Sequence, residues 1–572
     1  MVTTGAGFQD YLASYRHRRL DLLNQAAPIM GDYPDSVATT WNINVEAIAA
    51  ESLAATDLLR ASAFLHADGI PYDLIVSGAR ELGEAIQQHL AEVENDPLAF
   101  LTLLEPLKRY SLVRPEASEQ TYSVHRLVQA VVKTNLGEAA ARQWAERIVR
   151  VVTQAYPNAD DFNNWPECQR LLLHAQAAAT AVQHYRFDFS EAGLLLIRLG
   201  FYAQERGEYS TADPLYLQGL EIYKKALGDE HPHVALSLNN LAFLYKSQGR
   251  YAEAEPLYQQ ALALWQRLLG DEHPDVASSL NNLAALYDSQ GRYAEAEPLY
   301  QQALALRQRL LGQEHPAVAL SLNNLAALYR VQGRYGEAEP LLQQALALRQ
   351  RLLGDEHPDV ALSLNNLALL YYAKGRYAEA EPLYQQALAL GQRLLGQEHP
   401  AVALSLNNLA ALYYSQGRYA EAEPLYQQAL ALRKRLLGDE HPAVALSLNN
   451  LAALYQSQGR YAEAEPLLQQ AFQISRNALG DNHPDVGICL GNLASLYVAQ
   501  GRYSDAEPLF LEALSLFVQA VGQDHPYTTE TINRLAKFVR TVIEAGQTQL
   551  LSDHPVTQAL LQQLQSPSAK GS

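Results

Sequence analysis

Hydrophobic and polar positions along most of the chain repeat as two helical stretches followed by a short loop. After Pro400 the segment AVALSLNNLAALYYSQ places Leu404, Leu409 and Tyr413 at helical spacing. Pro400 suits the first turn of this helix, because a proline there loses no intrahelical hydrogen bond. Gly417 is expected to end the helix, since glycine readily adopts the positive φ of a C-terminal cap.

A second helix is predicted over RYAEAEPLYQQALALRKRLLG, and Gly438 closes it. Its apolar positions recur at three- and four-residue steps, as on the buried face of an amphipathic helix: Ala422, Tyr426, Ala429, Leu432 and Leu436. The loop GDEHP then turns the chain back. Each unit is therefore predicted to be a helical hairpin, and hairpins in series form an all-α solenoid.

The hairpin recurs with a fixed period of 42 residues. His-Pro recurs at this step at His231, His273, His315, His357, His399, His441, His483 and His525. Gly-Arg-Tyr keeps the same step, at Gly249, Gly291, Gly333, Gly375, Gly417, Gly459 and Gly501. Gly207 begins a related Gly-Glu-Tyr one step earlier, so the array is predicted to start before the first His-Pro.

The first 189 residues lack this period and predict a different fold. Helices are expected at 8–25, 44–65, 74–89 and 98–108, and a β-hairpin is expected from 111–114 and 121–124. A closing helix follows at 125–134. This order predicts a winged-helix-like domain over 1–135 and a helical linker over 136–189. The solenoid then covers 190–545 with about eight repeats and a capping helix near 526–545. The tail, 546–572, contains a weaker helix near 555–565.

Composition and charge exclude several classes of protein. The chain has 572 residues, 43 Lys+Arg and 62 Asp+Glu, and a formal net charge of -19. This balance disfavours nucleic acid and anionic membranes as partners, because both require clustered cations. Only two cysteines are present, too few for a disulfide framework. No apolar run approaches about 18 residues and the start lacks a secretion signal, which predicts a cytoplasmic protein.

The repeat unit resembles a known family. The pattern Leu-Ala-x-x-Tyr, Gly-x-Tyr-x-x-Ala and Tyr-x-x-Ala is present at Leu241, Ala242, Tyr245, Gly249, Tyr251, Ala254, Tyr258 and Ala261. It resembles the tetratricopeptide repeat (TPR), and NNLAxLY, EAEPLY and LGxxHPxV resemble its kinesin-light-chain type. The resemblance implies a right-handed superhelical solenoid that binds peptide or protein ligands in a concave groove.

Paired asparagines on each first helix are candidate groove residues. Asparagine is a mediocre helix former, so two per helix require a reason. The resemblance implies that the second of each pair binds the backbone of an extended peptide: Asn240, Asn282, Asn324, Asn366, Asn408 and Asn450. The alternative is hydrogen bonding between neighbouring hairpins.

One position on the second helix varies while its surroundings stay constant. It is occupied by Trp265, Arg307, Arg349, Gly391, Arg433 and Ser475. The resemblance implies that Arg307, Arg349 and Arg433 face the groove and contact acidic peptides. Positions expected opposite also vary, from Lys246 and Asp288 to Gln456. The alternative is variation on a solvated surface.

The N-terminal region resembles the part of bacterial STAND (NB-ARC-type) ATPases that follows their nucleotide-binding core. This likeness rests on the segments FQDYLASYRHRRLDLL, LLRASAFLHADGIPYDL and YSVHRLVQAVV. Val124-His125-Arg126 stands at that family's Met-His-Asp motif, which implies that His125 contacts a nucleotide phosphate. Arg126 departs from the motif, and the alternative is an ordinary winged-helix histidine. The chain contains no G-x-x-x-x-G-K-[ST] sequence, so an ATPase core is expected on another chain or has been lost.

These features predict an interaction protein without catalytic, metal or cofactor sites. Successive His-Pro histidines are separated by roughly two helix diameters, 16–20 Å, which is too far to share a metal ion. Each is expected to hydrogen-bond its own loop. Carboxylates such as Glu253 and Glu255 recur in every unit and are interpreted as a solvated face. The chain is thus predicted to be the sensor or scaffold arm of a STAND-type signalling system, with a nucleotide-binding domain as a further partner. The alternative is a pure TPR scaffold or a cargo-type adaptor.

Overall fold

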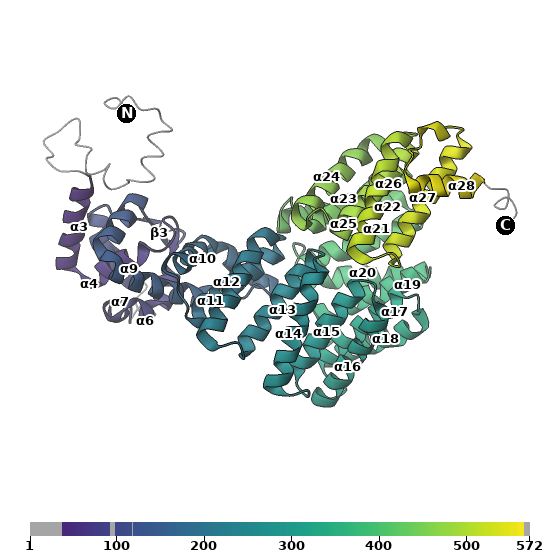
Figure 1. The fold of residues 1–572 in the computed structure, drawn as a ribbon. Coiled ribbons are helices and arrows are strands. Elements are labelled where there is room, and N and C mark those ends of the chain that lie inside the picture. Colours follow the sequence, from purple (N-terminus) through teal and green to yellow (C-terminus); the bar gives the residue numbers. More distant parts are fainter. Residues whose placement is uncertain (1–36, 92–97, 117, 566–572) are drawn as a thin grey trace, which may run out of the picture. The chain divides into compact units, whose positions relative to one another are not determined.

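The computed structural model describes residues 37–91, 98–116 and 118–565, which belong to two compact units (Figure 1). Unit 1 comprises the chain up to Tyr202 together with Leu217–Asp229, and unit 2 comprises Ala203–Tyr216 together with the chain from Glu230. The helix predicted at 8–25 and the polar end of the tail lie outside the described residues.

Unit 1 contains a small antiparallel sheet among helices. The strands are β1 (Ile70–Pro71), β2 (Val113–Glu116) and β3 (Thr121–Val124), in the order β1-β3-β2. Val113 lies opposite Val124 in the predicted hairpin, whose first strand begins two residues later than expected. The short strand β1 was not predicted, because two residues carry no periodic pattern. The winged-helix assignment of this unit stays a prediction.

The helices of unit 1 differ from the prediction where glycine or a capping residue interrupts them. They are α3 (Val37–Glu51), α4 (Leu53–Ser62), α5 (Tyr72–Ser77), α6 (Ala79–Leu82), α7 (Glu84–Leu90), α8 (Ala99–Arg109), α9 (Arg126–Ala155), α10 (Trp165–Tyr185) and α11 (Ser190–Glu205), with a 3-10 turn η1 at Phe162–Asn164. The single helix predicted at 44–65 is divided at Ser52, whose side chain caps α4. The one predicted at 74–89 is divided at Gly78 and Gly83. A methyl group at Gly78 would overlap Cγ1 of Val151, and Gly83 has a φ of +128°.

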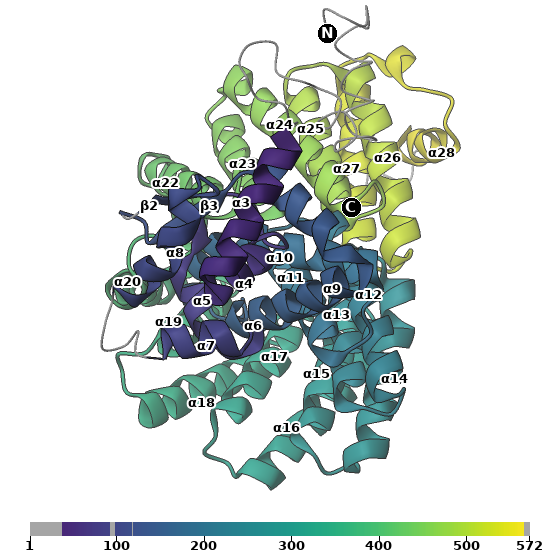
Figure 2. The ribbon, with the colours of Figure 1, turned by 90° about the vertical axis from the view of Figure 1, so that its left-hand side faces the viewer.

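Unit 2 consists of the predicted hairpins (Figures 1 and 2). Its first helices are α13 (Pro232–Ser247), α15 (Pro274–Ser289), α17 (Pro316–Val331), α19 (Pro358–Ala373), α21 (Pro400–Ser415), α23 (Pro442–Ser457) and α25 (Pro484–Ala499). The second helices are α14 (Tyr251–Leu269), α16 (Tyr293–Leu311), α18 (Tyr335–Leu353), α20 (Tyr377–Leu395), α22 (Tyr419–Leu437), α24 (Tyr461–Leu479) and α26 (Tyr503–Val521). The array is preceded by α12 (Tyr209–Leu227) and ends with α27 (Pro526–Glu544), a 3-10 turn η2 (Thr548–Leu550) and α28 (Pro555–Gln565).

Each His-Pro histidine of the 42-residue series is the N-cap of the helix that follows it, a first helix or α27. Its ring Nδ1 accepts the backbone N–H two residues later, as in the 3.1 Å bond from Ala317 to His315. Proline occupies the next position, where a missing N–H costs nothing. The expectation that these histidines hydrogen-bond their own loops is therefore confirmed.

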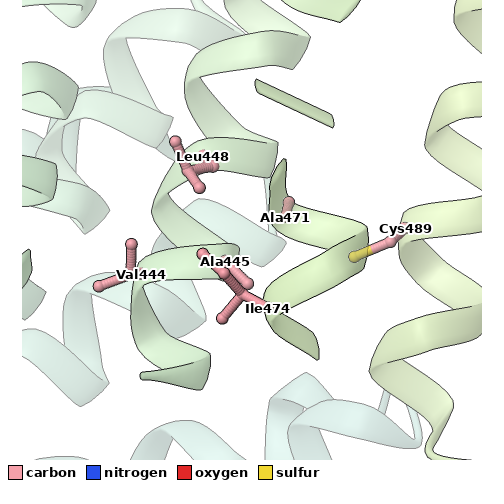
Figure 3. Close-up of a cluster of buried hydrophobic side chains, with 6 residues drawn as sticks. All are labelled: Val444, Ala445, Leu448, Ala471, Ile474 and Cys489. Carbon is pink, nitrogen blue, oxygen red and sulfur yellow. The ribbon is translucent and has the colours of Figure 1, made fainter. Parts of the chain in front are cut away.

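Small apolar clusters form the core between adjacent hairpins. Figure 3 shows one of them: Val444, Ala445, Leu448, Ala471, Ile474 and Cys489. On α22 the predicted stripe is buried from Ala422 to Leu432, with Tyr426 only 3% exposed, and Leu436 at its end is partly buried. On α21 the prediction was wrong at Leu404, which is 39% exposed. Its place on the helix faces away from the core because the buried face runs through Val402, Ala403, Leu406 and Leu409.

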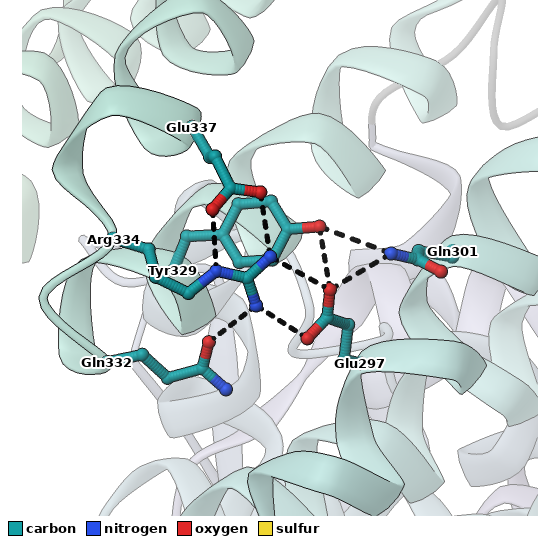
Figure 4. A network of polar contacts seen from close by, with 6 residues as sticks. All are labelled: Glu297, Gln301, Tyr329, Gln332, Arg334 and Glu337. Atoms are coloured by element: carbon teal, nitrogen blue, oxygen red, sulfur yellow. Dashed lines mark hydrogen bonds and ion pairs between the residues drawn. The ribbon is translucent and has the colours of Figure 1, made fainter.

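A polar network joins each repeat to the next, and Figure 4 shows it around Arg334. The guanidinium of Arg334 lies 4.0 Å from the ring centre of Tyr329 and donates a 2.6 Å hydrogen bond to Glu297 of the preceding repeat. It also donates to Glu337 of its own helix. Tyr329 donates to Glu297 at 3.0 Å. The equivalent carboxylate Glu255, interpreted above as solvated, is thus an inter-repeat partner, since it binds Arg292 at 2.8 Å.

The last copy of this carboxylate closes the array. Glu507 is 2% exposed and has no following Gly-Arg-Tyr turn to bind. It instead accepts hydrogen bonds from Ser552, through both N–H and Oγ, and from Thr557 Oγ1. The segment around α28 therefore occupies the site where another repeat would dock.

Three glycine turns contact histidines that lie 234 residues later, about 5.6 repeats along the array. A methyl group at Gly207, Gly249 or Gly291 would lie 2.6–2.9 Å from a ring carbon of His441, His483 or His525, respectively. We call these three pairs the inter-turn contacts. They show that the array closes a superhelical turn on itself within unit 2.

Burial at the first inter-turn contact changes the acid–base behaviour of His441. Desolvation lowers the pKa of His441 to about 4, opposed by a hydrogen bond to the backbone of Glu205. The cations Arg433 and Arg206 lower it further. The folded protein therefore favours the neutral ring, which is also the form that can accept the capping N–H.

We expect acid to weaken the fold through His441. Its folded pKa lies below the usual value near 6.5, so its contribution is present above pH 6.5 and is lost as the pH falls toward 4. The shift corresponds to about 3 kcal/mol. His441→Asn keeps a capping side chain that does not titrate. Thermal unfolding between pH 7 and 4 should show a smaller loss of stability in this variant, and equal losses would contradict the assignment.

Candidate ligand-binding groove

The first helices lie on the inner side of the curved array. Consecutive first helices, such as α17 and α19, pack more closely together than consecutive second helices do. A stack of hairpins curves toward the side on which its helices are closer. The solvent-facing side of the first helices is therefore the concave face of unit 2.

A row of exposed leucines follows this concave face. The residue five positions after each capping histidine is leucine in five repeats, and these side chains are 39–51% exposed: Leu236, Leu320, Leu362, Leu404 and Leu446. We call this set the leucine row. Leu236, Asn240 and Phe243 share one helix face by their spacing, so the row runs beside the asparagines. Sequence reasoning missed it, because an apolar residue at helical spacing was interpreted as core.

The asparagine pairs form a ladder between repeats. The second asparagine of one repeat donates to the first asparagine of the preceding repeat, as from Asn282 to Asn239 and from Asn324 to Asn281, both at 2.8 Å. Asn450 does the same at 2.8 Å and Asn366 at 3.5 Å. One amide hydrogen of each of these second asparagines therefore forms a hydrogen bond between neighbouring hairpins, which was the alternative to peptide binding. The second asparagines remain half-buried.

Arg307, Arg349 and Arg433 do not face an open groove. Their exposed fractions are 4–6%, and each donates to a serine hydroxyl of the next first helix at 2.8 Å, as Arg307 does to Ser321. Desolvation lowers the pKa of Arg433 to about 10. The expectation that they present charge to a ligand is corrected, because each guanidinium fills the space between neighbouring hairpins.

The fourth repeat lacks this arginine, and the ladder is interrupted there. With Gly391 in place of arginine, Ser405 accepts a 2.7 Å hydrogen bond from Nδ2 of Asn365. The Oδ1 atom of Asn365 is buried without a hydrogen bond, so Asn408 does not reach it as the other second asparagines reach their partners. The ladder bond persists in the first and sixth repeats, which have Trp265 and Ser475 at this position, so the interruption accompanies glycine rather than every loss of the arginine.

The edge and the end of the concave face carry the charges. Lys246 and Asp288 lie at the variable edge, and burial lowers the pKa of Lys246. At the C-terminal end a cavity of about 410 Å³ is lined by Val498, Phe510, Glu530, Arg534, Lys537 and Phe538, among others. Arg534 takes the position of the ladder asparagine and donates to Asn492 at 3.3 Å.

The remaining candidate, His125, caps α9 in unit 1. Its Nδ1 accepts the N–H of Leu127 at 3.2 Å, and its side chain is exposed. Arg126 pairs with Asp68 at 3.7 Å.

In the ranges that the structure describes, no cluster of three or more His, Cys, Asp or Glu side chains could hold a metal ion. None of the described helices is long and apolar enough to cross a membrane.

Two family models match the chain. The model described as tetratricopeptide repeat matches residues 191–264, 234–309, 317–393, 359–435, 401–476 and 443–519. A second model, a domain of unknown function (DUF7779), matches residues 46–141. The first match covers the hairpins of unit 2, and the second covers the sheet and the surrounding helices of unit 1.

Proteins similar to this chain include one curated relative and two solved structures. A nucleotide-binding leucine-rich repeat (NLR)-like protein of Hyaloscypha variabilis is 42% identical over 137 residues, which are 23% of this chain and 13% of that protein. A putative kinesin light chain with nearly identical TPR-like repeats from Podosopora anserina is 34% identical, covering 36% of this chain and 97% of that one, with a TM-score of 0.31. A STAND protein with a TPR sensor from Pyrococcus horikoshii is 15% identical, covering 91% and 72%, with a TM-score of 0.44.

We expect the asparagine ladder to contribute unequally to stability along the array. Asn324→Ala removes a 2.8 Å hydrogen bond and should cost about 1 kcal/mol, whereas Asn408→Ala should cost less because Asn365 has no such bond. In a Gly391→Arg background the arginine should occupy Ser405 and release Asn365. The cost of Asn408→Ala in denaturant unfolding should then rise toward that of Asn324→Ala. Gly391→Ala is the control for helix propensity, and an unchanged cost in the arginine background would refute this interpretation.

Proposed function

Because this chain belongs to the tetratricopeptide-repeat family, we propose that the concave face of unit 2 binds an extended segment of a partner protein or peptide. Repeats of this family form scaffolds for protein interaction. The observation that carries the proposal is the leucine row, whose side chains are 39–51% exposed in one line across the first helices. Aligned apolar residues on a concave surface are typical of a binding site, unlike scattered ones.

The chemistry of the face suits an extended chain. Each leucine supplies an apolar contact at the same place in successive repeats. The neighbouring asparagine offers a carboxamide oxygen and a second amide hydrogen, which can pair with a peptide backbone. In this proposal the second asparagines bind the ligand: Asn240, Asn282, Asn324, Asn366, Asn408 and Asn450. Four of them, Asn282, Asn324, Asn366 and Asn450, also form the ladder.

Charge favours a ligand that carries acidic groups near its ends. The whole chain has a net charge of -19, yet Arg330 stands at the variable edge and Arg534 and Lys537 line the terminal cavity. Glu530 accepts a hydrogen bond from Arg534 at 3.0 Å and offsets one of these cations. The acidic groups would meet these exposed cations rather than the buried Arg307, Arg349 and Arg433.

A second proposal concerns unit 1, which we infer to be the part that couples the array to a nucleotide-binding domain. The likeness of this chain, over 137 residues, to a nucleotide-binding NLR-like protein supports such a partner domain. In this arrangement His125, at the start of α9, contacts the bound nucleotide and the array acts as the sensor arm. In a mixture of this chain and the nucleotide-binding domain, His125→Ala should weaken the binding of nucleotide to that domain. No change would favour a pure scaffold or cargo-type adaptor.

We expect serine substitutions in the leucine row to abolish ligand binding without unfolding the array. Serine is compatible with this position, because Ser278 occupies it in the second repeat. Peptides selected from a random library on the full chain should bind Leu320→Ser/Leu362→Ser/Leu404→Ser at least tenfold more weakly, since a buried leucine contributes about 1.5–3 kcal/mol. Isothermal titration calorimetry measures the change.

The matched control replaces exposed leucines outside the concave face. Leu269 and Leu352 are each 37% exposed near the ends of second helices. Leu269→Ser/Leu352→Ser should leave the affinity of the same peptides unchanged. An equal loss of affinity in both variants, or no loss in the leucine-row variant, would show that the peptides bind outside the concave face.

A further inference from the structure

The same six residues adopt two backbone conformations in this chain. The sequence LGDEHP occurs at 227–232, 269–274, 353–358 and 437–442. In the first three copies the histidine has a φ of -136°, -140° and -137°, whereas His441 in the last has a φ of -75°. His483 and His525 share the second conformation, with φ of -76° and -68°. Local sequence cannot explain this difference.

The three histidines with the second conformation are those of the inter-turn contacts. Each ring lies against a glycine turn one superhelical turn earlier, and His483 also hydrogen-bonds the backbone of Ser247. Beside the first pair, Arg206 donates a 3.0 Å hydrogen bond to the carbonyl of Leu436 at the end of α22. The tertiary contact, rather than the hexapeptide, therefore sets the conformation of these loops.

The two turns meet at separate points rather than along a continuous core. A cavity of about 650 Å³ lies beside the middle pair, between Gln248–Glu253 on one side and Leu479–His483 on the other. Within each turn, by contrast, adjacent repeats share apolar clusters and the arginine network. Separating the turns would break the inter-turn contacts and leave every hairpin packed on its neighbours.

We propose that the inter-turn contacts form a clasp that closes the superhelical turn and opens without unfolding any repeat. In the closed state the loops at 438–441 and 480–483 take the second conformation. In the open state they relax to the conformation of 354–357, and the array lengthens along its axis. This inference goes beyond the proposed function, because it holds whether or not the concave face binds a ligand.

Hydrogen exchange on the unmodified full chain gives the first test, because the chain contains its own reference. The loops 354–357 and 438–441 have the same sequence, so their intrinsic exchange rates match. Mass spectrometry should show slower exchange in 438–441 than in 354–357. Equal exchange in the two loops would show that the clasp is open in solution and would overturn the proposal.

Alanine substitutions at glycine give a matched pair of variants. Gly207→Ala/Gly249→Ala/Gly291→Ala places methyl groups against the histidine rings, whereas Gly333→Ala/Gly375→Ala/Gly417→Ala meets no atom within 4 Å. Both sets have φ between +68° and +74°, so both bear the same backbone strain. Only the first set should remove the extra protection of 438–441 and 480–483 and increase the radius of gyration in small-angle X-ray scattering.

The outcomes of this comparison are distinct. A larger radius of gyration with unchanged helical circular dichroism in the first set supports a clasp that opens as a unit. Identical scattering and exchange in the two sets would show that the inter-turn contacts do not keep the superhelical turn closed, and this result would refute the proposal. A loss of helical signal in the first set alone would show that opening and unfolding are the same event, and this also refutes the proposal.

Discussion

The guanidinium of the Gly-Arg-Tyr turn is the contact on which the array depends. Each one lies over a tyrosine of its own hairpin and reaches a carboxylate of the preceding hairpin, as Arg334 reaches Glu297. A hairpin with two apolar helices cannot bury both alone, so the fold requires one directional contact that sets how the next hairpin stacks. The carboxylate is about three-quarters buried, where a charged hydrogen bond is stronger than at an exposed surface. Repeating this geometry fixes the curvature, and the curvature in turn exposes the first helices as a concave face and brings the second turn against the first.

Much of this fold could be predicted from the sequence, because most of it is local. The capping histidine, the proline after it and the glycine at each helix end act within a few residues, so the hairpins begin and end close to where the pattern places them. The failures involve partners that are distant in sequence. Gly78 divides a predicted helix because Val151 packs against it, and LGDEHP has a second conformation at 437–442 because an earlier turn contacts it. A periodic pattern carries no information on either contact.

The candidate site shows the same division. The asparagine pairs stood out because they are poor helix formers, and the structure gives a reason for them in the ladder. The arginines stood out because their position varies, but variation accompanies packing as well as binding, and the structure buries them. The leucine row was hidden for the opposite reason, since a leucine at helical spacing is indistinguishable from core until the neighbouring helix is placed. Gly391 connects the two observations, because in the repeat where glycine replaces the arginine the buried Asn365 donates to Ser405 and the ladder bond is absent.

The near-identity of the loops at the inter-turn contacts bears on how such a gene changes. Recombination between copies of the unit adds or deletes whole hairpins from the interior of the array. After such an event each glycine turn with a repeat about 5.6 units later would still face a His-Pro loop, because each copy brings both. The terminal segment that satisfies Glu507 would move outward unchanged. The number of hairpins can therefore vary between descendants of this gene while the superhelical closure is inherited intact.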